Sequence, residues 1–401
     1  MRLLWYKLSY RRKISGWPFW LQHDFFQVFT MALSRHLSPF VILSAALFTL
    51  LSMSIQAEEA EAEAEAIYSE QQAIIEVRER WVLNLFFEND LFSNSDQQYT
   101  NGVRASWVSP EIDSFIDDER LPLWMRQANR LLTPLDPTAQ DSGEEVSRRV
   151  VFSLGQKMFT PGDRDRTSID PDDRPYAGWL YAGLGYHTRT LNRLNSFEVN
   201  LGMVGPAALA HEAQDWVHDM RGIERFSGWD NQLRNELGVQ LVYEHKNRIH
   251  RSRLGNAIQQ DLIVHGGGSL GNVATYLNTG AQYRIGHNLP ADFGTSALRP
   301  GGDNSVPAPI NNNGNGAGHW GVHGFISTDG RWVLQDIFLD GNTFRSSHSV
   351  DKRALVGDIS IGIATTIDRW KLSYATIWRS KQFKTQKNTH SYGSFTISYS
   401  L

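Results

Sequence analysis

The sequence predicts an all-β fold, a twelve-stranded antiparallel transmembrane β-barrel that carries an extracellular loop helix. After Arg80, short segments alternate apolar residues with small or polar ones, which is the periodicity of β-strands. Many segments are about 9–15 residues long, enough to cross a bilayer when tilted, and Trp and Tyr often lie near their ends. A soluble sandwich or barrel shows the same alternation, but these lengths and a signal sequence favour the membrane.

Residues 1–57 are predicted to be a targeting segment rather than part of the fold. An apolar run, Pro39–Met53, follows Arg35 and ends shortly before Ala57, which is the arrangement of a signal peptide. A transmembrane anchor is the alternative. The run has about 15 residues, however, and a membrane-spanning helix needs ~20.

The segment that follows, residues 58–79, is predicted to be an acidic linker. Its start, Glu58–Ala66, alternates Glu with Ala and has the low complexity of a solvated connection. Residues 1–30 are interpreted as an extension upstream of a natural start at Met31. The barrel is therefore expected over residues 80–401.

Composition excludes several kinds of site. The chain has no cysteine, which excludes disulfides, thiolate nucleophiles and Cys-based zinc sites. A net charge of −4 gives no reason to expect nucleic-acid binding. The sequence contains no Gly-x-Ser-x-Gly motif, so a serine hydrolase is not favoured.

Thirteen segments of the chain show strand alternation. Bacterial single-chain barrels close with an even number of strands. Segments 319–328 and 331–339 are therefore predicted to form one strand, with a bend or bulge at Asp329-Gly330. The twelve predicted strands are 81–88, 100–108, 149–159, 178–187, 195–204, 235–245, 259–269, 273–287, 319–339, 353–367, 370–380 and 391–400.

The order of the strands predicts which connections meet outside the cell. With the N-terminus in the periplasm, the first strand ends outside at Glu88–Asp90, and connections 160–177 and 205–234 are also external. Segment 109–148 falls on the periplasmic side. Its Leu121–Leu132 stretch is expected to be a helical insertion that covers the lower end of the barrel.

Within the second of these external connections, Ala207–Met220 is predicted to form a helix, because a Gly-Pro pair precedes it and Gly222 follows it. His211, Gln214 and His218 occur at i, i+3 and i+7, which places them on one helix face. A solvated polar face is the simplest interpretation of such a pattern.

Glu88–Asp90 alone are most simply a turn at the end of a strand. A carboxylate such as Asp90 with neighbouring oxygens would nevertheless suit a hard cation such as Ca²⁺. A histidine facing that cation could activate water. The order of the chain allows these groups to meet at the extracellular rim.

The chain resembles the lipid A 3′-O-deacylase family of Gram-negative outer membranes, the LpxR-like proteins. The resemblance covers residues 80–401 and implies a twelve-stranded barrel with its active site at the extracellular rim, between the outer wall and a loop helix. The C-terminal strands match in pattern only. The matching motifs are Phe87-Glu88-Asn89-Asp90, Tyr99-Thr100-Asn101-Gly102, Gly155-Gln156, Thr160-Pro161-Gly162, Asp173-Arg174-Pro175-Tyr176-Ala177-Gly178-Trp179, and Gly205-Pro206 through Gln214 and His218 to Glu224.

This resemblance also implies roles for individual residues. His218 matches the histidine that activates water as general base, and Asp90 and Glu224 match the carboxylates that bind Ca²⁺. Thr100 matches a residue beside the metal. The polar groups that orient the site match Asn89 and Gln214. Lys157, Arg164 and Arg166 are candidates for contacting the anionic sugar-phosphate head group.

The implied substrate is lipid A of lipopolysaccharide, which would lose its 3′-linked acyloxyacyl group. A related phospholipase of the outer membrane and a non-enzymatic porin or scaffold remain alternatives. The protein is expected to contact outer-membrane lipids and to be monomeric. Trp179 is expected in the aromatic girdle, and Arg104 is expected to pair with a luminal acid.

Overall fold

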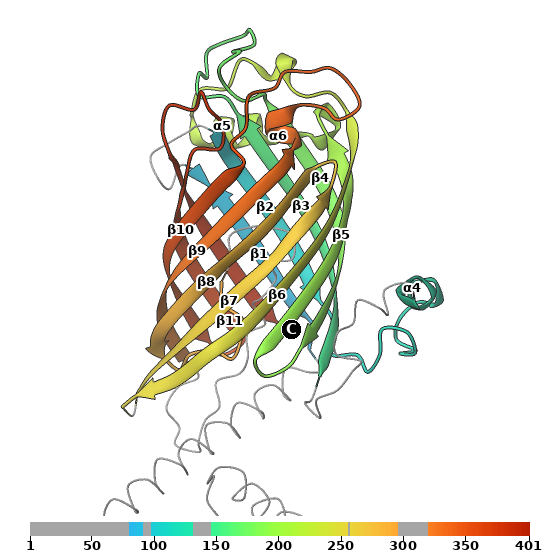
Figure 1. Cartoon of the computed structure of the whole chain (residues 1–401), viewed down its shortest axis with the longest axis vertical. Helices are drawn as coiled ribbons and strands as arrows, with labels where there is room; N and C mark the ends of the chain where they lie inside the picture. The colour runs from blue at the N-terminus through green and yellow to red at the C-terminus, as the bar shows by residue number, and fades with distance from the viewer. Residues whose placement is uncertain (1–79, 91–97, 131–145, 256, 296–319) are drawn as a thin grey trace, which may run out of the picture. The chain divides into compact units, whose positions relative to one another are not determined.

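Twelve strands form a closed antiparallel barrel in the computed structural model, which describes residues 80–90, 98–130, 146–255, 257–295 and 320–401. Each strand pairs with its neighbours in sequence, and β1 closes the barrel on β12 (Figure 1). The strands are β1 (Val82–Asn89), β2 (Gln98–Val108), β3 (Ser147–Thr160), β4 (Ala177–Arg189), β5 (Arg193–Val204), β6 (Glu236–Leu254), β7 (Ile258–Gly271), β8 (Ala274–His287), β9 (Trp320–Asp336), β10 (Leu355–Ile367), β11 (Trp370–Arg379) and β12 (His390–Ser400).

Alternation along each strand separates an apolar outer wall from a polar lumen. In β1, Leu85 and Phe87 are exposed on the outside, whereas Asn84 and Glu88 are buried inside. This apolar-out, polar-in arrangement is the one that a membrane barrel requires. The predicted fold class is confirmed. The predictions for residues 1–57 and 58–79 lie outside the described residues.

The two segments merged at Asp329-Gly330 form the single strand β9, so the merger is confirmed. The bulge predicted there is wrong, because both residues stay in register with β8 and β10. The irregularity lies further along, where Thr275 pairs with Gln335 and Tyr276 with Val333.

The barrel has two distinct ends. The end that carries α5 (Ala210–Arg221) and α6 (Ile337–Asp340), at the top of Figure 1, is called the helix end. The opposite end, where β1 begins and β12 finishes, is called the terminal end. In the described ranges no helix is long and apolar enough to cross a membrane.

Charged and apolar side chains fill much of the lumen. At the terminal end, the segment after β8 enters the barrel, where the buried Asp292 carboxylate contacts Arg284 and Lys371. At the helix end, the rings of Phe159 and Phe338 stack at 4.2 Å. A cavity of about 1470 Å³, open solvent included, is lined by residues from both regions.

Two expectations about single luminal or wall residues have different outcomes. Arg104 pairs with Glu198 at 3.0 Å inside the lumen, as predicted. Trp179 is not part of an aromatic girdle, because it points inward and stacks on Tyr181 at 4.2 Å. Its strand alternation, with Leu180 exposed outside, places it in the core.

The insertion between β2 and β3 was predicted to cover the lower end of the barrel, and this prediction is wrong. Its helix, α4 (Leu123–Asn129), lies beside the barrel in Figure 1. Met125 of α4 packs in a cluster with Val150 and Tyr186, whose side chains face outward from β3 and β4. The insertion therefore covers part of the outer wall near the terminal end.

Candidate functional site on the outer wall

Helix α5 lies on the outer wall at the helix end, against β3 and β4. The turn η3 (Pro206–Ala208) leads into it, and Gly222 ends it with a φ of 66°. That left-handed conformation favours glycine and is common where helices end. The predicted helix over Ala207–Met220 is confirmed, although its first residues form the 3-10 turn.

Two contacts hold this helix close to the wall. Gly178 of β4 faces outward, and a Cβ there would lie 2.4 Å from the Cβ of Ala210. The side-chain amide of Gln156 in β3 donates a 2.7 Å hydrogen bond to the carbonyl of Ala208. The absence of a side chain at Gly178 thus allows the helix to approach the strand.

One face of α5 is turned toward the barrel and carries two polar side chains. Ala210, Gln214 and His218 are buried at i, i+4 and i+8, with Gln214 2% and His218 3% exposed. His211 was predicted on this face but lies at its margin, with 41% of its side chain exposed. Its ring stacks on that of Trp229 at 5.6 Å.

The histidine ring of His218 is fixed by its Nδ1 atom. Nδ1 lies 2.7 Å from the backbone carbonyl oxygen of Glu224, and Phe226 packs against the ring edge-on at 5.8 Å. A carbonyl oxygen can only accept, so Nδ1 carries the proton and donates. In the neutral ring, Nε2 then keeps its lone pair and can accept a proton.

The orientation of the Gln214 side-chain amide follows from its hydrogen bond to Trp229. The indole Nε1 of Trp229 lies 2.7 Å from its side-chain oxygen. An indole N–H can only donate, so the atom that it meets must be Oε1 and the NH₂ group must lie on the other side. That NH₂ nitrogen is buried and makes no hydrogen bond to any residue that the structure describes.

Aromatic residues form an apolar base under the helix. Met158, Tyr176, Phe226 and Trp229 are buried together with Ala210. Burial raises the pKa of Tyr176 to about 12, so its hydroxyl stays neutral. This packing surrounds the two polar groups of α5 with material of low polarity, in which hydrogen bonds are electrostatically stronger than in water.

A row of outward-facing residues continues from this base around the wall. In register, Asn89 of β1 pairs with Asn101 of β2, Asn101 with Met158 of β3, and Met158 with Gly178 of β4. Both asparagines occupy lipid-facing positions, yet Asn89 is 4% and Asn101 7% exposed. The row therefore places two buried amides on the same side of the wall as α5.

The two predicted metal ligands have different environments. Asp90 follows Asn89 directly and is fully buried. The Glu224 carboxylate is 78% exposed and accepts a 2.7 Å hydrogen bond from Arg164, while its carbonyl accepts from His218. In the described part of the chain, no three His, Asp or Glu side chains are grouped so that they could hold a metal ion.

The remaining predicted residues are scattered. Lys157 points into the lumen and lines the cavity there, so it does not share a face with His218. Arg166 forms a 2.9 Å ion pair with Asp170 in the connection after β3. Thr100 lies at a register shift in β2, and its side chain is outside the described residues.

Sequence reasoning missed Trp229 and Phe226 as parts of this site, and it named Asn101 only within a matching motif, without a role. Asn101 carried a usable signal, because it is a polar residue at a lipid-facing position of a strand. Trp229 and Phe226 carried none, since their partners Gln214 and His218 lie on another element of the same connection.

Comparisons with known proteins identify the family. The family described as outer membrane protein LpxR matches residues 43–401. Among solved structures, LpxR from Salmonella typhimurium is 17% identical with a TM-score of 0.58, and the match covers 79% of this chain and 99% of that one.

Other solved barrels are less similar. The β domain of the Bordetella autotransporter BrkA is 9% identical with a TM-score of 0.38, covering 80% of this chain and 98% of that one. The translocator domain of NalP from Neisseria meningitidis is 9% identical with a TM-score of 0.32, covering 86% and 98%. No curated protein matches the chain. At 17% identity, the likeness to the Salmonella structure supports the barrel fold alone, and the two structures with TM-scores under 0.5 add no support.

Proposed function

The chain belongs to the LpxR family of outer membrane proteins, and we propose on this premise that it is a lipid A deacylase of the outer membrane. The reaction would be hydrolysis of the ester that links the 3′ acyloxyacyl group to lipid A. The observation that carries the proposal is the placement of His218, which is buried against the outer wall with Nδ1 held by a carbonyl. The helix end would be the extracellular end.

In the proposed reaction, His218 acts as general base through Nε2. It takes a proton from water, and the resulting hydroxide attacks the carbonyl carbon of the ester. The tetrahedral intermediate then collapses, the bond to the sugar oxygen breaks, and protonated His218 gives its proton to that oxygen. The products are the 3′ acyloxyacyl group, released as a carboxylic acid, and a free sugar hydroxyl.

Gln214 would stabilise the charge that develops on the carbonyl oxygen. Its NH₂ group is buried, makes no bond to a described residue, and is held in one orientation by Trp229. A donor that is already oriented requires no reorganisation when the oxyanion forms. Asn89 and Asn101 offer further amides along the same wall.

Ca²⁺ fits the chemical type of the proposed ligands, because Asp90 and Glu224 supply hard carboxylate oxygens. When bound, the ion would polarise the ester carbonyl and stabilise the oxyanion. Glu224 would have to exchange its contact with Arg164 for the metal. This exchange would free the Arg164 guanidinium for an anionic group of the substrate.

The position of the site suits a lipid substrate. The row of outward-facing residues that leads to α5 lies on the same outer face of the strands as Val103 and Leu154. These two side chains are 46% and 54% exposed. An acyl chain that lies along this wall could reach His218 without leaving the membrane. Lys157 is separated from this path by the barrel wall, so Arg164 and Arg166 are the head-group candidates that remain on the outside.

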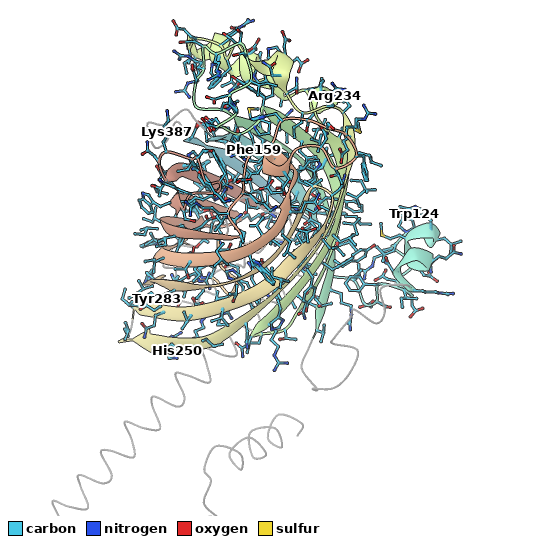
Figure 2. All side chains as sticks on the ribbon, turned by 45° about the horizontal axis from the view of Figure 1, so that its top comes forward. Trp124, Phe159, Arg234, His250, Tyr283 and Lys387 are labelled. Atoms are coloured by element: carbon cyan, nitrogen blue, oxygen red, sulfur yellow. The ribbon has the colours of Figure 1, made fainter. Side chains whose placement is uncertain are left out.

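Mass spectrometry of lipid A from cells that express the chain tests the function. We expect loss of the 3′ acyloxyacyl group with the wild type and an intact lipid A with His218→Gln, because a general base supplies about 10²–10⁴-fold in rate. His250→Gln is the matched control, since His250 lies at the terminal end of the barrel (Figure 2). Heat-modifiable gel mobility reports whether each barrel is folded.

The outcomes separate the alternatives. Deacylation by His218→Gln at the wild-type rate would refute the role of His218. Accumulation of lysophospholipid with intact lipid A would indicate a phospholipase instead. No lipid change with a folded wild type, in the presence of Ca²⁺, would contradict enzymatic function in these cells.

A further inference from the structure

Helix α4 exposes two large apolar side chains to its surroundings. Leu123 and Trp124 are each 62% exposed, and Figure 2 shows Trp124 on the outside of the barrel. Two adjacent exposed side chains of this size form a contiguous apolar patch, and such patches often mark sites that contact a membrane or another protein. No step of the proposed hydrolysis uses them.

The insertion is anchored to the part of the wall that faces lipid. Leu121 and Met125 are buried with Val150 and Tyr186 of the outer face, and Phe115 packs edge-on against Tyr186 at 5.3 Å. These contacts make α4 continuous with the apolar wall. Its free side therefore faces outward, where lipid contacts the barrel.

The level of α4 along the barrel is that of a ring of tryptophans. Trp107 on β2 pairs in register with Phe152, two residues from Val150 on β3. The ring lies near the terminal end, on β2, β9 and β11 and directly before β1, and each member is at least 36% exposed. Its members are Trp81, Trp107, Trp320 and Trp370.

The same ring has a gap where α4 lies. Strands β3 to β8 contain one tryptophan, Trp179, and it points into the lumen. Helix α4 packs on β3 and β4, and its Trp124 places an exposed indole in this sector. Tryptophan is enriched at the membrane–water interface because its ring is apolar and its N–H is polar.

Two exposed acids of the insertion are separated from its apolar pair in sequence. The acids Asp113 and Asp117 are exposed in the turn before the helix, away from the Leu123 and Trp124 pair in sequence. Asp118 accepts a 2.6 Å hydrogen bond from Arg120, which holds the pKa of that carboxyl below its ordinary value. The acidic turn can thus stay in water while the helix contacts lipid.

We propose that α4 is an interfacial anchor, with Leu123 and Trp124 inserted among phospholipid acyl chains of the leaflet at the terminal end. The partner is a phospholipid bilayer surface, and the contact extends the lipid-facing wall beyond the strands. The anchor is independent of the hydrolysis proposed above, and it gives the insertion a role in holding the barrel at a fixed depth.

The absence of cysteine allows a direct test on the whole protein. Trp124→Cys and, as matched control in the same insertion, Asp117→Cys are labelled with an environment-sensitive fluorophore and reconstituted into phosphatidylcholine vesicles. We expect the label at position 124 to emit at shorter wavelength and to be quenched at least twofold by lipids spin-labelled near the head group. Iodide in the buffer should quench position 117 and leave position 124 almost unaffected.

Three results would overturn the anchor. The first is quenching of position 124 by iodide alone. The second is quenching of position 124 by neither iodide nor spin-labelled lipid, which would indicate a contact with protein. The third is equal quenching by spin-labelled lipid at positions 124 and 117. Leu123→Cys repeats the measurement with Trp124 intact, so an effect of removing the indole is distinguished from the position of the helix. Heat-modifiable mobility confirms that each labelled barrel is folded.

Discussion

At the residue scale, the orientation of the Gln214 amide depends on one hydrogen bond. The Trp229 indole donates to its oxygen at 2.7 Å, and both side chains are buried. Without this donor, the amide could rotate by half a turn and present its oxygen where the substrate oxyanion would form. An acceptor at that point would repel the oxyanion rather than stabilise it.

We therefore expect Trp229→Phe to lower kcat by roughly tenfold with little change in KM, since full loss of an oxyanion donor costs about 10²–10³ in kcat. The measurement is the deacylation rate in detergent-solubilised lipid A. Trp332→Phe, on the exposed wall of β9, is the control. In a Gln214→Ala background, Trp229→Phe should not lower kcat further. If it lowers kcat as much there as in the wild type, Trp229 acts through packing rather than through Gln214.

Asp90 gives a prediction about metal dependence. Asp90→Asn removes one charged oxygen from the proposed Ca²⁺ site, so the Ca²⁺ concentration that supports half-maximal deacylation should rise. Chelator should abolish wild-type activity and leave the barrel folded, because strand pairing and lipid burial hold it together. The measurement is a Ca²⁺ titration of deacylation for both proteins.

Asp172→Asn in the exposed connection after β3 is the matched control for that titration. Superimposable curves for wild type and Asp90→Asn would remove Asp90 from the ligand set. Full activity in excess chelator would eliminate a metal requirement altogether.

At the element scale, the approach of α5 to β4 depends on one missing side chain. A Cβ at Gly178 would lie 2.4 Å from the Cβ of Ala210 and 3.1 Å from that of Ala208. Neither neighbour is a flexible side chain that could rotate away. The helix itself, with His218 and Gln214 on its inner face, would have to move from the wall.

Gly178→Ala should therefore reduce deacylation by at least tenfold while the barrel still assembles, because a displacement of about 1 Å at a catalytic group can cost about 10²-fold. Gly357→Ala in β10 is the control, since a Cβ there meets no atom within 4 Å. Activity and heat-modifiable mobility are measured for both. Equal activity of the two variants would mean that the helix position does not matter.

At the scale of the whole barrel, the segment packed inside the terminal end of the lumen disfavours an open pore. The Asp292 carboxylate contacts Arg284 and Lys371, and Phe293 packs with Leu194 and Ile263 across the terminal end. Removal of one partner from a buried ion pair costs about 3–5 kcal/mol. The segment after β8 is thus held firmly inside the barrel.

The wild-type barrel should therefore show no open-channel current in planar bilayers, and Asp292→Ala should produce one. Asp351→Ala, an exposed acid in the connection after α6, is the control and should stay closed. Steady porin-like conductance of the wild type would contradict this prediction and would favour the porin alternative.

The sequence by itself determined the barrel and the members of α5. Strand alternation is a local pattern of the sequence, and closed bacterial barrels favour an even number of strands. All twelve strands were therefore predictable, including the merger at Asp329-Gly330. Gly222 likewise marked the end of the helix, because its conformation is a local property of the backbone.

Tertiary structure alone decided which faces are covered. Alternation places Asn101 on the outer wall, but it cannot indicate that the residue is buried there. It also cannot indicate that Trp229 orients Gln214 or that α4 packs outside the barrel rather than below it. These arrangements depend on contacts between segments far apart in the sequence. The packing that stabilises them cannot be predicted from the local periodicity of the sequence.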